Sequence, residues 1–219
     1  MDIPTLVEVR RLRKVLPAPP CLPGEVTNVW TSQTWNAPSD GYVRACLSSG
    51  GGGGGGTYGG GSSALAFWRW RKILKGQSLV FTLGAGGQYT PSITDGGRST
   101  LTAPWGSMTA DPGKAGGGTG GSGGAGGISG TGADYYGPGN TGSTSGGGVL
   151  NPFCLPAVLS YKFTTPAQGW LAVIDLKAVG NGGATNIATG PGGGGGTNGS
   201  SSGPGGGGFG IFEYCAAMA

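Results

Sequence analysis

The sequence contains no histidine, so it lacks the side chain that proteins use most often as a general base and as a metal ligand. Its four cysteines show no Cys-x-x-Cys or other zinc spacing, and its nine acidic residues are scattered without a close pair. These absences argue against acid–base catalysis and against a metal centre. We therefore expect a protein that is not an enzyme and that binds no cofactor and no metal.

Charge and long apolar runs are also scarce. Charged residues make up 10% of the chain and the net charge is +4. No apolar stretch approaches the roughly 20 residues of a membrane span, and the first residues lack the apolar core of a secretory signal peptide. We expect a soluble protein made in a cytoplasm. The cysteines lie in apolar contexts, which favours buried thiols over disulfides.

Glycine, in contrast, is abundant, with 54 glycines and 15 prolines among 219 residues. Such a composition is typical of low-complexity or disordered chains. Disordered chains, however, have few aromatic residues and a high net charge, whereas aromatic residues make up 9% of this chain and hydrophobic residues 36%. The composition therefore indicates a globular protein into which glycine has been inserted.

Short stretches rich in β-branched and aromatic residues alternate with glycine tracts, and this pattern predicts strands. The strand candidates include residues 64–70, 78–84, 99–103 and 210–216, and the tracts are residues 50–61, 113–148, 180–183 and 190–208. Residues 35–51 and 163–183 also resemble each other. Both place an aromatic residue before a proline, then a glycine, a strand and further glycines, which indicates two copies of one structural device.

The glycine tracts have two interpretations. Flexible linkers join domains, but these tracts alternate with strands too short to be domains. Polyglycine can instead form a helix with three residues per turn whose N–H and C=O groups all point outward. Without side chains, such helices can pack closely and bond to several neighbours, offsetting an ordering cost of roughly 1–2 kcal/mol per residue. We predict an all-β fold in which short antiparallel strands anchor a bundle of polyglycine II helices.

Residues 1–27 differ from the rest of the chain, with one glycine, five prolines and a cluster of cations. Apolar residues at helical spacing predict a short helical or extended segment that docks on a partner protein. The candidate docking residues are Leu6, Val9, Leu12, Arg13 and Leu16. A solvated terminal helix and a nucleic-acid arm are the alternatives. We divide the chain into this segment, a glycine-rich repeat at 28–149 and a second, shorter repeat at 150–219 packed on the first.

Three stretches carry a resemblance to a known family: "TSQTWNAPSDGYVRACLSSGGGGGGGTYGGG", "LKGQSLVFTLGAGGQ" and "ITDGGRSTLTA". Together they resemble the glycine-rich domain of bacteriophage tail fibres and tail-tip proteins. The matching positions are Trp35, Pro38, Gly50 to Gly56, Gly76, Gln77, Gly84, Gly86, Gly87, Gly96, Gly97 and Thr100. The ending "GGGGFGIFEY" resembles the closing glycine run and strand of that family. The chain is also similar to the fibre-tip adhesins of T-even-like phages, whose polyglycine helices display receptor-binding loops.

This resemblance implies a non-enzymatic tail protein of the virion, assembled in the host cytoplasm, that contributes to binding a bacterial surface receptor, either a glycan or an outer-membrane protein. Its partners would be other tail or fibre proteins, reached through residues 1–27, with no nucleic acid and no membrane insertion; a homotrimer is compatible with this role. One alternative is a purely structural tail component without receptor contact. Another is an extracellular structural or ice-binding polyglycine protein, which predicts a flat threonine-rich face that the sequence does not make visible.

Candidate receptor-binding residues come from exposed aromatic and hydrogen-bonding side chains. The stretch "GADYYGPGN" interrupts the longest glycine tract, and its proline and glycines predict a loop. It supplies Asp134, Tyr135, Tyr136 and Asn140, and Trp105 follows a proline turn. The alternative is that these aromatic residues pack on the bundle. In "FWRWRK", strand alternation predicts Trp68 and Trp70 together on a buried face, with Arg69 and Arg71 on an exposed one.

Overall fold

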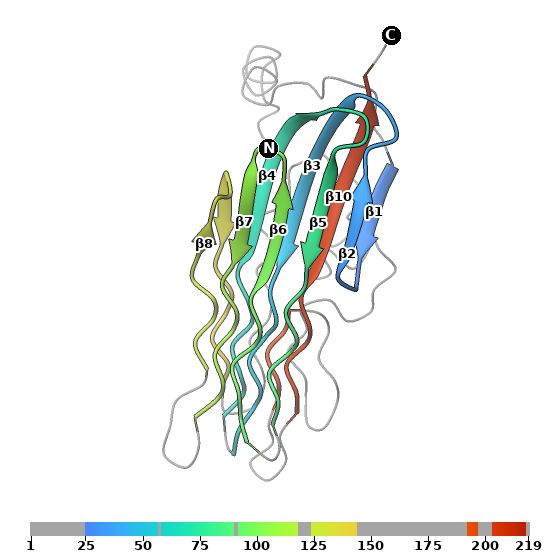
Figure 1. Ribbon diagram of the computed structural model, residues 1–219. Helices are drawn as coiled ribbons and strands as arrows, with labels where there is room; N and C mark the ends of the chain where they lie inside the picture. Colours follow the sequence, from blue (N-terminus) through green and yellow to red (C-terminus); the bar gives the residue numbers. More distant parts are fainter. Residues whose placement is uncertain are drawn as a thin grey trace, which may run out of the picture.

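Two β-sheets make up one end of the molecule, and glycine-rich segments extend from them toward the other end (Figure 1). The computed structural model describes residues 25–56, 58–89, 92–117, 124–143, 192–196 and 203–217. Within these ranges the regular structure consists of ten β-strands without a helix. The all-β prediction is therefore confirmed, and the four strand candidates correspond to β4, β5, β6 and β10.

Each sheet has five antiparallel strands. The first sheet has the order β1 (Glu25–Val29), β10 (Phe209–Ala216), β3 (Gly41–Ser48), β4 (Leu65–Ile73) and β9 (Tyr135–Gly137). The second sheet has the order β2 (Gln33–Asn36), β5 (Ser78–Thr82), β6 (Ser99–Ala103), β7 (Gly106–Ala110) and β8 (Gly130–Thr131). The connection from β8 to β9 joins the edges of the two sheets, because β8 pairs with β7 and β9 pairs with β4.

This topology differs from the division into repeats that the sequence suggested. The last strand, β10, lies between β1 and β3, so residues 209–216 complete the first sheet instead of belonging to a separate repeat. The boundary predicted after residue 27 falls inside β1. Local patterns suggested the repeats, whereas the pairing of β10 with β3 joins residues far apart in the sequence. The predicted docking residues of the N-terminal segment lie outside the described residues, as does the second copy of the echo at 163–183.

The hydrophobic core fills the space between the sheets. In β5, β6 and β7, burial alternates along each strand, so that Leu79, Phe81, Leu101 and Met108 point inward and are at most 1% exposed. Aromatic rings join the two layers, since Phe212 of β10 lies 4.9 Å from the ring of Trp35 and 5.8 Å from that of Phe81. Burying each such side chain contributes about 1.5–3 kcal/mol.

A β-bulge in the pairing of β3 with β4 corrects the prediction for the tryptophans. Ala45 lies opposite Trp68 and Val43 lies opposite Arg71, so two residues of β4 face Arg44. The extra residue changes the alternation of side chains along β4. Trp68 packs into the core, whereas the ring of Trp70 lies 4.8 Å from the guanidinium carbon of Arg44. The two tryptophans therefore do not share a buried face.

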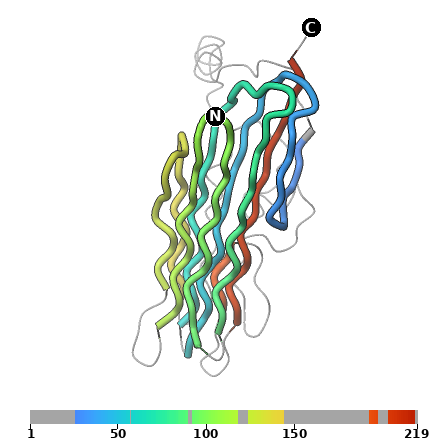
Figure 2. The backbone as a smooth tube through the Cα atoms, viewed as in Figure 1, coloured from blue at the N-terminus to red at the C-terminus, as the bar shows by residue number. Residues whose placement is uncertain are grey.

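Glycine-rich segments continue the strands as wavy, extended chains (Figure 2). Those that continue the first sheet form the first glycine layer: residues 50–55, 58–64, 139–143 and 203–208. Those that continue the second sheet form the second glycine layer: residues 84–88, 94–97, 111–116 and 124–129. Each segment of the two glycine layers therefore directly follows or precedes a strand of one of the two packed sheets.

Hydrogen bonds in segment 50–55 repeat every third residue. The donor–acceptor pairs are Gly50 to Gly97, Gly53 to Thr94, Gly51 to Gly206, Gly54 to Gly203, Gly52 to Gly61 and Gly55 to Tyr58, with N–O distances between 2.8 and 3.0 Å. Positions three apart therefore donate to one neighbouring segment, and consecutive positions donate to three different segments. An ordinary β-strand would bond in the plane of one sheet, with neighbours on two sides only.

Carbonyl groups of the same segment bond to further neighbours. Gly50 and Gly53 accept from Gly113 and Gly116, while Gly51 accepts from Gly87 and Gly52 from Gly195, all at 2.8 to 3.0 Å. Segment 50–55 is therefore bonded to three segments through its amides and to three others through its carbonyls. Segment 58–64 follows the same rule, because Gly61 and Ala64 donate to Lys114 and Asp111, again three residues apart.

This packing leaves no room for side chains. A Cβ atom on Gly51 would overlap the carbonyl oxygen of Gly193, one on Gly52 that of Lys114, and one on Gly53 that of Gln88. These three consecutive positions face three different segments. Glycine is required here by the close approach of neighbouring backbones, since none of the three has a positive φ angle.

A polar contact between the side chain of Asp95 and segment 111–116 also holds the glycine segments together. The carboxylate accepts from Nζ of Lys114 and from the amide of Ala115, both at 2.8 Å. Partial burial raises the pKa of Asp95, but these hydrogen bonds and the charge of Lys114 lower it more, so the net pKa lies below its ordinary value. The contact therefore stabilises the fold at neutral pH and is lost as the pH falls through that lowered pKa.

The cysteines follow the sequence prediction in part. Cys46 is a buried thiol, whereas Cys215 near the end of β10 is disulfide-bonded, which corrects the prediction of buried thiols. Apolar neighbours in the sequence indicate burial, but a disulfide depends on the approach of a second cysteine in space. Cys21 and Cys154 lie outside the described residues.

Two glycine-to-alanine variants test the close packing. Gly53→Ala should lower the free energy of unfolding by about 2–3 kcal/mol, because the methyl group forces neighbouring backbones apart. Gly207→Ala is the matched control, since Gly207 is exposed and its added Cβ would lie 3.8 Å from the nearest atom, the oxygen of Gly84. Chemical denaturation measures both. Equal stability of the two variants would contradict the packing described above.

Candidate functional site

Residues 130–137, which comprise β8, β9 and their connection, hold three of the residues predicted to bind a receptor: Asp134, Tyr135 and Tyr136. Tyr135 and Tyr136 lie in the edge strand β9, which corrects the prediction that this stretch is a loop. Antiparallel pairing places Tyr135 opposite Phe67 and Tyr136 opposite Ala66. Because consecutive residues of a strand point to opposite faces, the two tyrosine rings cannot act as one stacked pair.

Tyr135 lies on the outer face of the first sheet and is 44% exposed. Its ring stacks on Phe67 with centroids 6.3 Å apart, and the guanidinium carbon of Arg69 lies 4.5 Å from its centroid. Asp134 accepts a hydrogen bond from the amide of Arg69 at 2.8 Å and forms an ion pair with Arg71. We call Arg69, Arg71, Asp134 and Tyr135 the edge cluster.

Tyr136 belongs to the packed interior. It packs against the hydrophobic core, and its hydroxyl oxygen accepts a hydrogen bond from the amide of Ala133 at 2.8 Å. Asn140 lies in the first glycine layer. Its backbone N–H donates to Oγ of Ser62 at 2.8 Å, and its backbone carbonyl accepts from the backbone N–H of Ser62 at 3.0 Å. Asn140 is exposed but is separated along the chain from Tyr135 of the edge cluster by the buried Gly137 and three further residues.

Trp105 lies in the turn between β6 and β7 and is half-buried. Its ring packs edge-on against Trp68 with centroids 5.6 Å apart, so it extends the core. Its indole N–H is buried without a hydrogen-bond partner among the described residues. The structure thus brings Asp134 and Tyr135 together and places Tyr136, Asn140 and Trp105 in other environments.

The two arginines of the edge cluster were only partly anticipated. Alternation in "FWRWRK" predicted an exposed basic face, and Arg69 is exposed. The sequence contained no signal for the approach of Asp134, which lies 65 residues further along the chain and reaches β4 only through the pairing of β9.

A row of hydroxyl groups crosses the outer face of the second sheet. Pairing between strands places Thr82, Thr100, Thr109 and Thr131 side by side, one from each of β5, β6, β7 and β8. The hydroxyls of Thr109 and Thr131 are 3.0 Å apart, and in the next row those of Thr102 and Ser107 are 2.9 Å apart. Sequence reasoning missed this face, because threonines become a row only once strand register is known.

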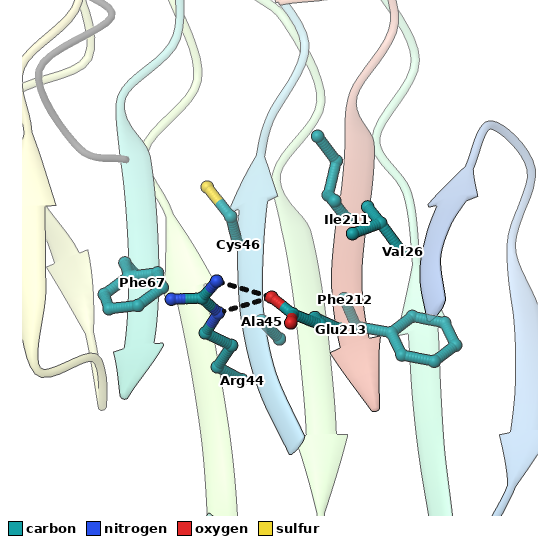
Figure 3. A pocket seen from close by; sticks show the side chains of 8 residues that line it. All are labelled: Val26, Arg44, Ala45, Cys46, Phe67, Ile211, Phe212 and Glu213. Atoms are coloured by element: carbon teal, nitrogen blue, oxygen red, sulfur yellow. Dashed lines mark hydrogen bonds and ion pairs between the residues drawn. The ribbon is translucent and has the colours of Figure 1, made fainter. Parts of the chain in front are cut away.

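A small pocket on the outer face of the first sheet contains a buried ion pair (Figure 3). Nε and Nη2 of Arg44 donate to Oε2 of Glu213 at 2.8 and 2.5 Å, and both side chains are 5% exposed. The residues lie directly opposite each other on β3 and β10. The other residues that line the pocket are Val26, Ala45, Cys46, Phe67, Ile211 and Phe212. The charges of Arg44 and Glu213 neutralise each other, and the thiol of Cys46 also lines the pocket.

The described residues include no group of three or more metal-ligating side chains. No helix in the described ranges is long and apolar enough to cross a membrane.

The ion pair gives a testable prediction for stability. Glu213→Gln removes the counter-charge of a buried guanidinium and should cost about 3–5 kcal/mol of unfolding free energy. The double variant Arg44→Met, Glu213→Leu removes both charges and should recover most of that loss. Urea denaturation of the three proteins measures the difference. If Glu213→Gln is as stable as the unmodified protein, the pair is not shielded from water.

In comparisons with known proteins, no family model matches the chain and no curated protein is similar enough to identify a relative.

Proposed function

We propose that the glycine segments are polyglycine II helices, and that the protein is a non-enzymatic bacteriophage tail-fibre-tip or tail-tip protein that contributes to host-receptor binding. The proposal of polyglycine II helices rests on the hydrogen bonds, whose partner segments repeat at every third residue. A helix with three residues per turn directs positions i and i+3 to the same neighbour and consecutive positions to three different ones. Segment 50–55 has this arrangement in both its donors and its acceptors.

The tail role is supported by where the residues of the family resemblance lie. Trp35 packs between the sheets against Phe212, and Gly76 has a φ of 80° in the turn between β4 and β5. The resembling glycines from Gly50 to Gly55, together with Gly84, Gly87, Gly96 and Gly97, lie in the two glycine layers and take part in the inter-segment hydrogen bonds. The resemblance therefore involves residues that build the bundle and its anchoring sheet.

A bundle held by hydrogen bonds across both layers suits a rigid, protruding part of a virion. Rigid scaffolds position the exposed segments that make contacts in recognition. Location in the virion, and attachment to other tail or fibre proteins through residues 1–27, are parts of the same proposal. The disulfide at Cys215 is compatible with a particle surface, where disulfides persist.

The edge cluster is the part of the predicted receptor site that we retain. It combines an exposed aromatic ring of β9 with two arginines of β4 and a carboxylate directly before β9. Aromatic and arginine side chains are enriched among residues that dominate binding energies at interfaces. We propose that Tyr135, Arg69 and Asp134 contact the receptor.

Binding of the labelled protein to intact bacteria tests this function. Tyr135→Ala should weaken binding by about 1–3 kcal/mol, as for an ordinary interface hot spot, and should leave the melting temperature nearly unchanged. Tyr136→Ala is the matched control. It should lower the melting temperature, because Tyr136 packs on the core, and should leave binding by the folded protein intact.

The receptor-binding role would be contradicted if the protein bound no bacterial strain able to adsorb the phage that encodes it. Full binding by Tyr135→Ala would instead exclude the edge cluster and leave the purely structural tail component as the better proposal.

The hydroxyl face supports a second candidate, an ice-binding polyglycine protein. Each row of side chains runs across neighbouring strands, which lie about 4.8 Å apart. Successive rows are two residues apart along a strand, a distance of roughly 6.7 Å. The outward residues of these rows, Thr34, Val80, Thr82, Thr100, Thr102, Ser107, Thr109 and Thr131, carry no charge. This candidate predicts thermal hysteresis that is abolished by Thr100→Lys, whereas the tail proposal predicts none in either protein.

A further inference from the structure

The four segments of the second glycine layer lie side by side and continue β5, β6, β7 and β8 (Figure 2). One direction of each segment faces the first glycine layer, because a Cβ added there would overlap one of that layer's carbonyl oxygens. The glycines that face this way are Gly86, Gly96, Gly113 and Gly126. A second direction faces a neighbour in the same layer, as at Gly84, whose added Cβ would overlap the oxygen of Gly97. The third direction is left open to solvent.

The residues that point in this third direction all carry side chains. They are Ala85 and Gln88, Asp95 and Arg98, Asp111 and Lys114, and Ala125 and Ile128. The members of each pair are three residues apart, as a helix with three residues per turn requires. Asp111 is half-buried and the others are exposed. The outer side of this layer is therefore an open surface that continues the hydroxyl face of the second sheet.

Contacts between the segments show which of these residues share a row. The first row consists of Ala85, Arg98, Asp111 and Ile128. Within it, Arg98 forms an ion pair with Asp111 at 3.4 Å. The backbone agrees, because Gly97 donates to the carbonyl of Ala85 and Asp111 donates to that of Ser129, both at 2.7 Å. The first row thus has an ion pair in the middle and an apolar side chain at each end.

The second row lies three residues further from the sheet and consists of Gln88, Asp95, Lys114 and Ala125. Nζ of Lys114 lies 2.8 Å from the carboxylate of Asp95. Thr94 donates to the carbonyl of Gln88 at 3.1 Å, and the amide of Lys114 donates to that of Ala125 at 2.9 Å. This row also has an ion pair in the middle, but the order of its charges is reversed. We call the two rows together the outer rows.

The four charges of the outer rows form a checkerboard without net charge. The segment before β6 carries Arg98 and Asp95, and the segment after β7 carries Asp111 and Lys114. Opposite charges are therefore neighbours both along and across the segments. A two-fold rotation about an axis parallel to the strands, midway between β6 and β7, exchanges these two segments. A second copy placed face to face by this rotation sets an anion of one copy on a cation of the other in both rows.

The same rotation matches the rest of the surface. Ile128 of one copy meets Ala85 of the other. This contact covers the most exposed large apolar side chain of the described residues, since Ile128 is 75% exposed. On the sheet, a row of four hydroxyls meets the same row in reverse order. These hydroxyls belong to Thr82, Thr100, Thr109 and Thr131. The surface is therefore complementary to itself in charge and in polarity.

We propose that two copies of this chain form a dimer through the outer rows and the hydroxyl face, related by this two-fold axis. Such an interface is isologous, because the same patch serves both copies. The two ion pairs that meet in each row form a network of four charges. Exposed ion pairs contribute little individually, so we expect a reversible dimer that depends on concentration.

The direction of the axis determines how the two copies project. An axis parallel to the strands points both glycine regions the same way and leaves both edge clusters uncovered, because these lie on the outer faces of the first sheets. An axis perpendicular to the strands would also set opposite charges on each other, but it would carry the two hydroxyl faces apart. Burial of the hydroxyl face in the dimer would prevent contact with ice, so the dimer counts against that candidate function. The dimer does not depend on the tail role.

Sedimentation equilibrium of the full-length protein over a concentration series tests the proposal. The unmodified chain should follow a monomer–dimer equilibrium. Ile128→Glu should weaken dimerisation at least tenfold, because it buries a charge without a cation opposite it. Leu74→Glu is the matched control, since Leu74 is 44% exposed in the turn between β4 and β5, outside the proposed interface. It should dimerise like the unmodified protein. The melting temperature of each variant shows that it folds.

Exchanging the charges of the second row tests the pairing itself. The double variant Asp95→Lys, Lys114→Asp keeps opposite charges facing each other in a dimer of two variant chains. In a mixed dimer with the unmodified chain, like charges face each other in that row. The variant should therefore dimerise with itself, whereas mixed dimers should fall about threefold below the statistical proportion in native mass spectrometry.

A monomer at the highest soluble concentration would overturn the proposal, and so would a trimer, because a two-fold interface closes at two copies. Equal dimerisation of Ile128→Glu and Leu74→Glu would place the interface elsewhere. Loss of self-association in the folded double variant would favour the perpendicular axis and overturn the parallel one. Carbodiimide cross-linking of mixed isotope-labelled and unlabelled unmodified chains needs no variant. It should link Lys114 of one copy to Asp95 of the other, and links within single chains only would contradict the dimer.

Discussion

The close approach of backbones without Cβ atoms is the constraint on which the structure depends. Each amide of segment 50–55 bonds to a neighbour in one of three directions, and a methyl group at Gly51, Gly52 or Gly53 would overlap a carbonyl oxygen of another segment. The hydrogen bonds between segments therefore form only where side chains are absent. Substituting a single central glycine separates several chains at once.

The sheets provide what isolated glycine chains lack. Ordering glycine is costly, because it loses more conformational freedom than any other residue. For one segment, a net gain of about 0.5–1.5 kcal/mol for each hydrogen bond does not exceed the conformational entropy cost of ordering its glycines. Each described segment of the two glycine layers, however, begins or ends at a strand whose apolar side chains are packed in the sandwich. The strands fix the positions of the segments, so that many hydrogen bonds form together.

The sequence predicted those features that local composition determines. Strands at 64–70, 78–84, 99–103 and 210–216 were predicted because their apolar and β-branched residues are contiguous. The alternation of strands with glycine tracts also predicted that strands would anchor the tracts. Features that depend on pairing were missed. The bulge that separates Trp68 from Trp70, the threonine row of the second sheet and the entry of β10 between β1 and β3 all require strand register.

The candidate site was predicted less well than the fold, for the same reason. Tyr135 and Tyr136 are adjacent in sequence, but β9 pairs with β4 and sends their rings to opposite faces. Asp134 gains its neighbours Arg69 and Arg71 only through that pairing. Proline and glycine around the tyrosines indicated a loop, and the hydrogen bonds available at the sheet edge outweighed this local preference.

Amide hydrogen exchange, resolved by residue, tests the central claim most directly. If the glycine segments form a hydrogen-bonded bundle, the amides of residues 50–55 and 192–196 should be protected to a degree comparable with those of β3 and β4. Each of these amides from 50 to 55 has a carbonyl partner within 3.0 Å. Exchange at the rate of an unstructured chain in both segments, while β3 and β4 stay protected, would contradict the account and restore the interpretation of the tracts as flexible linkers.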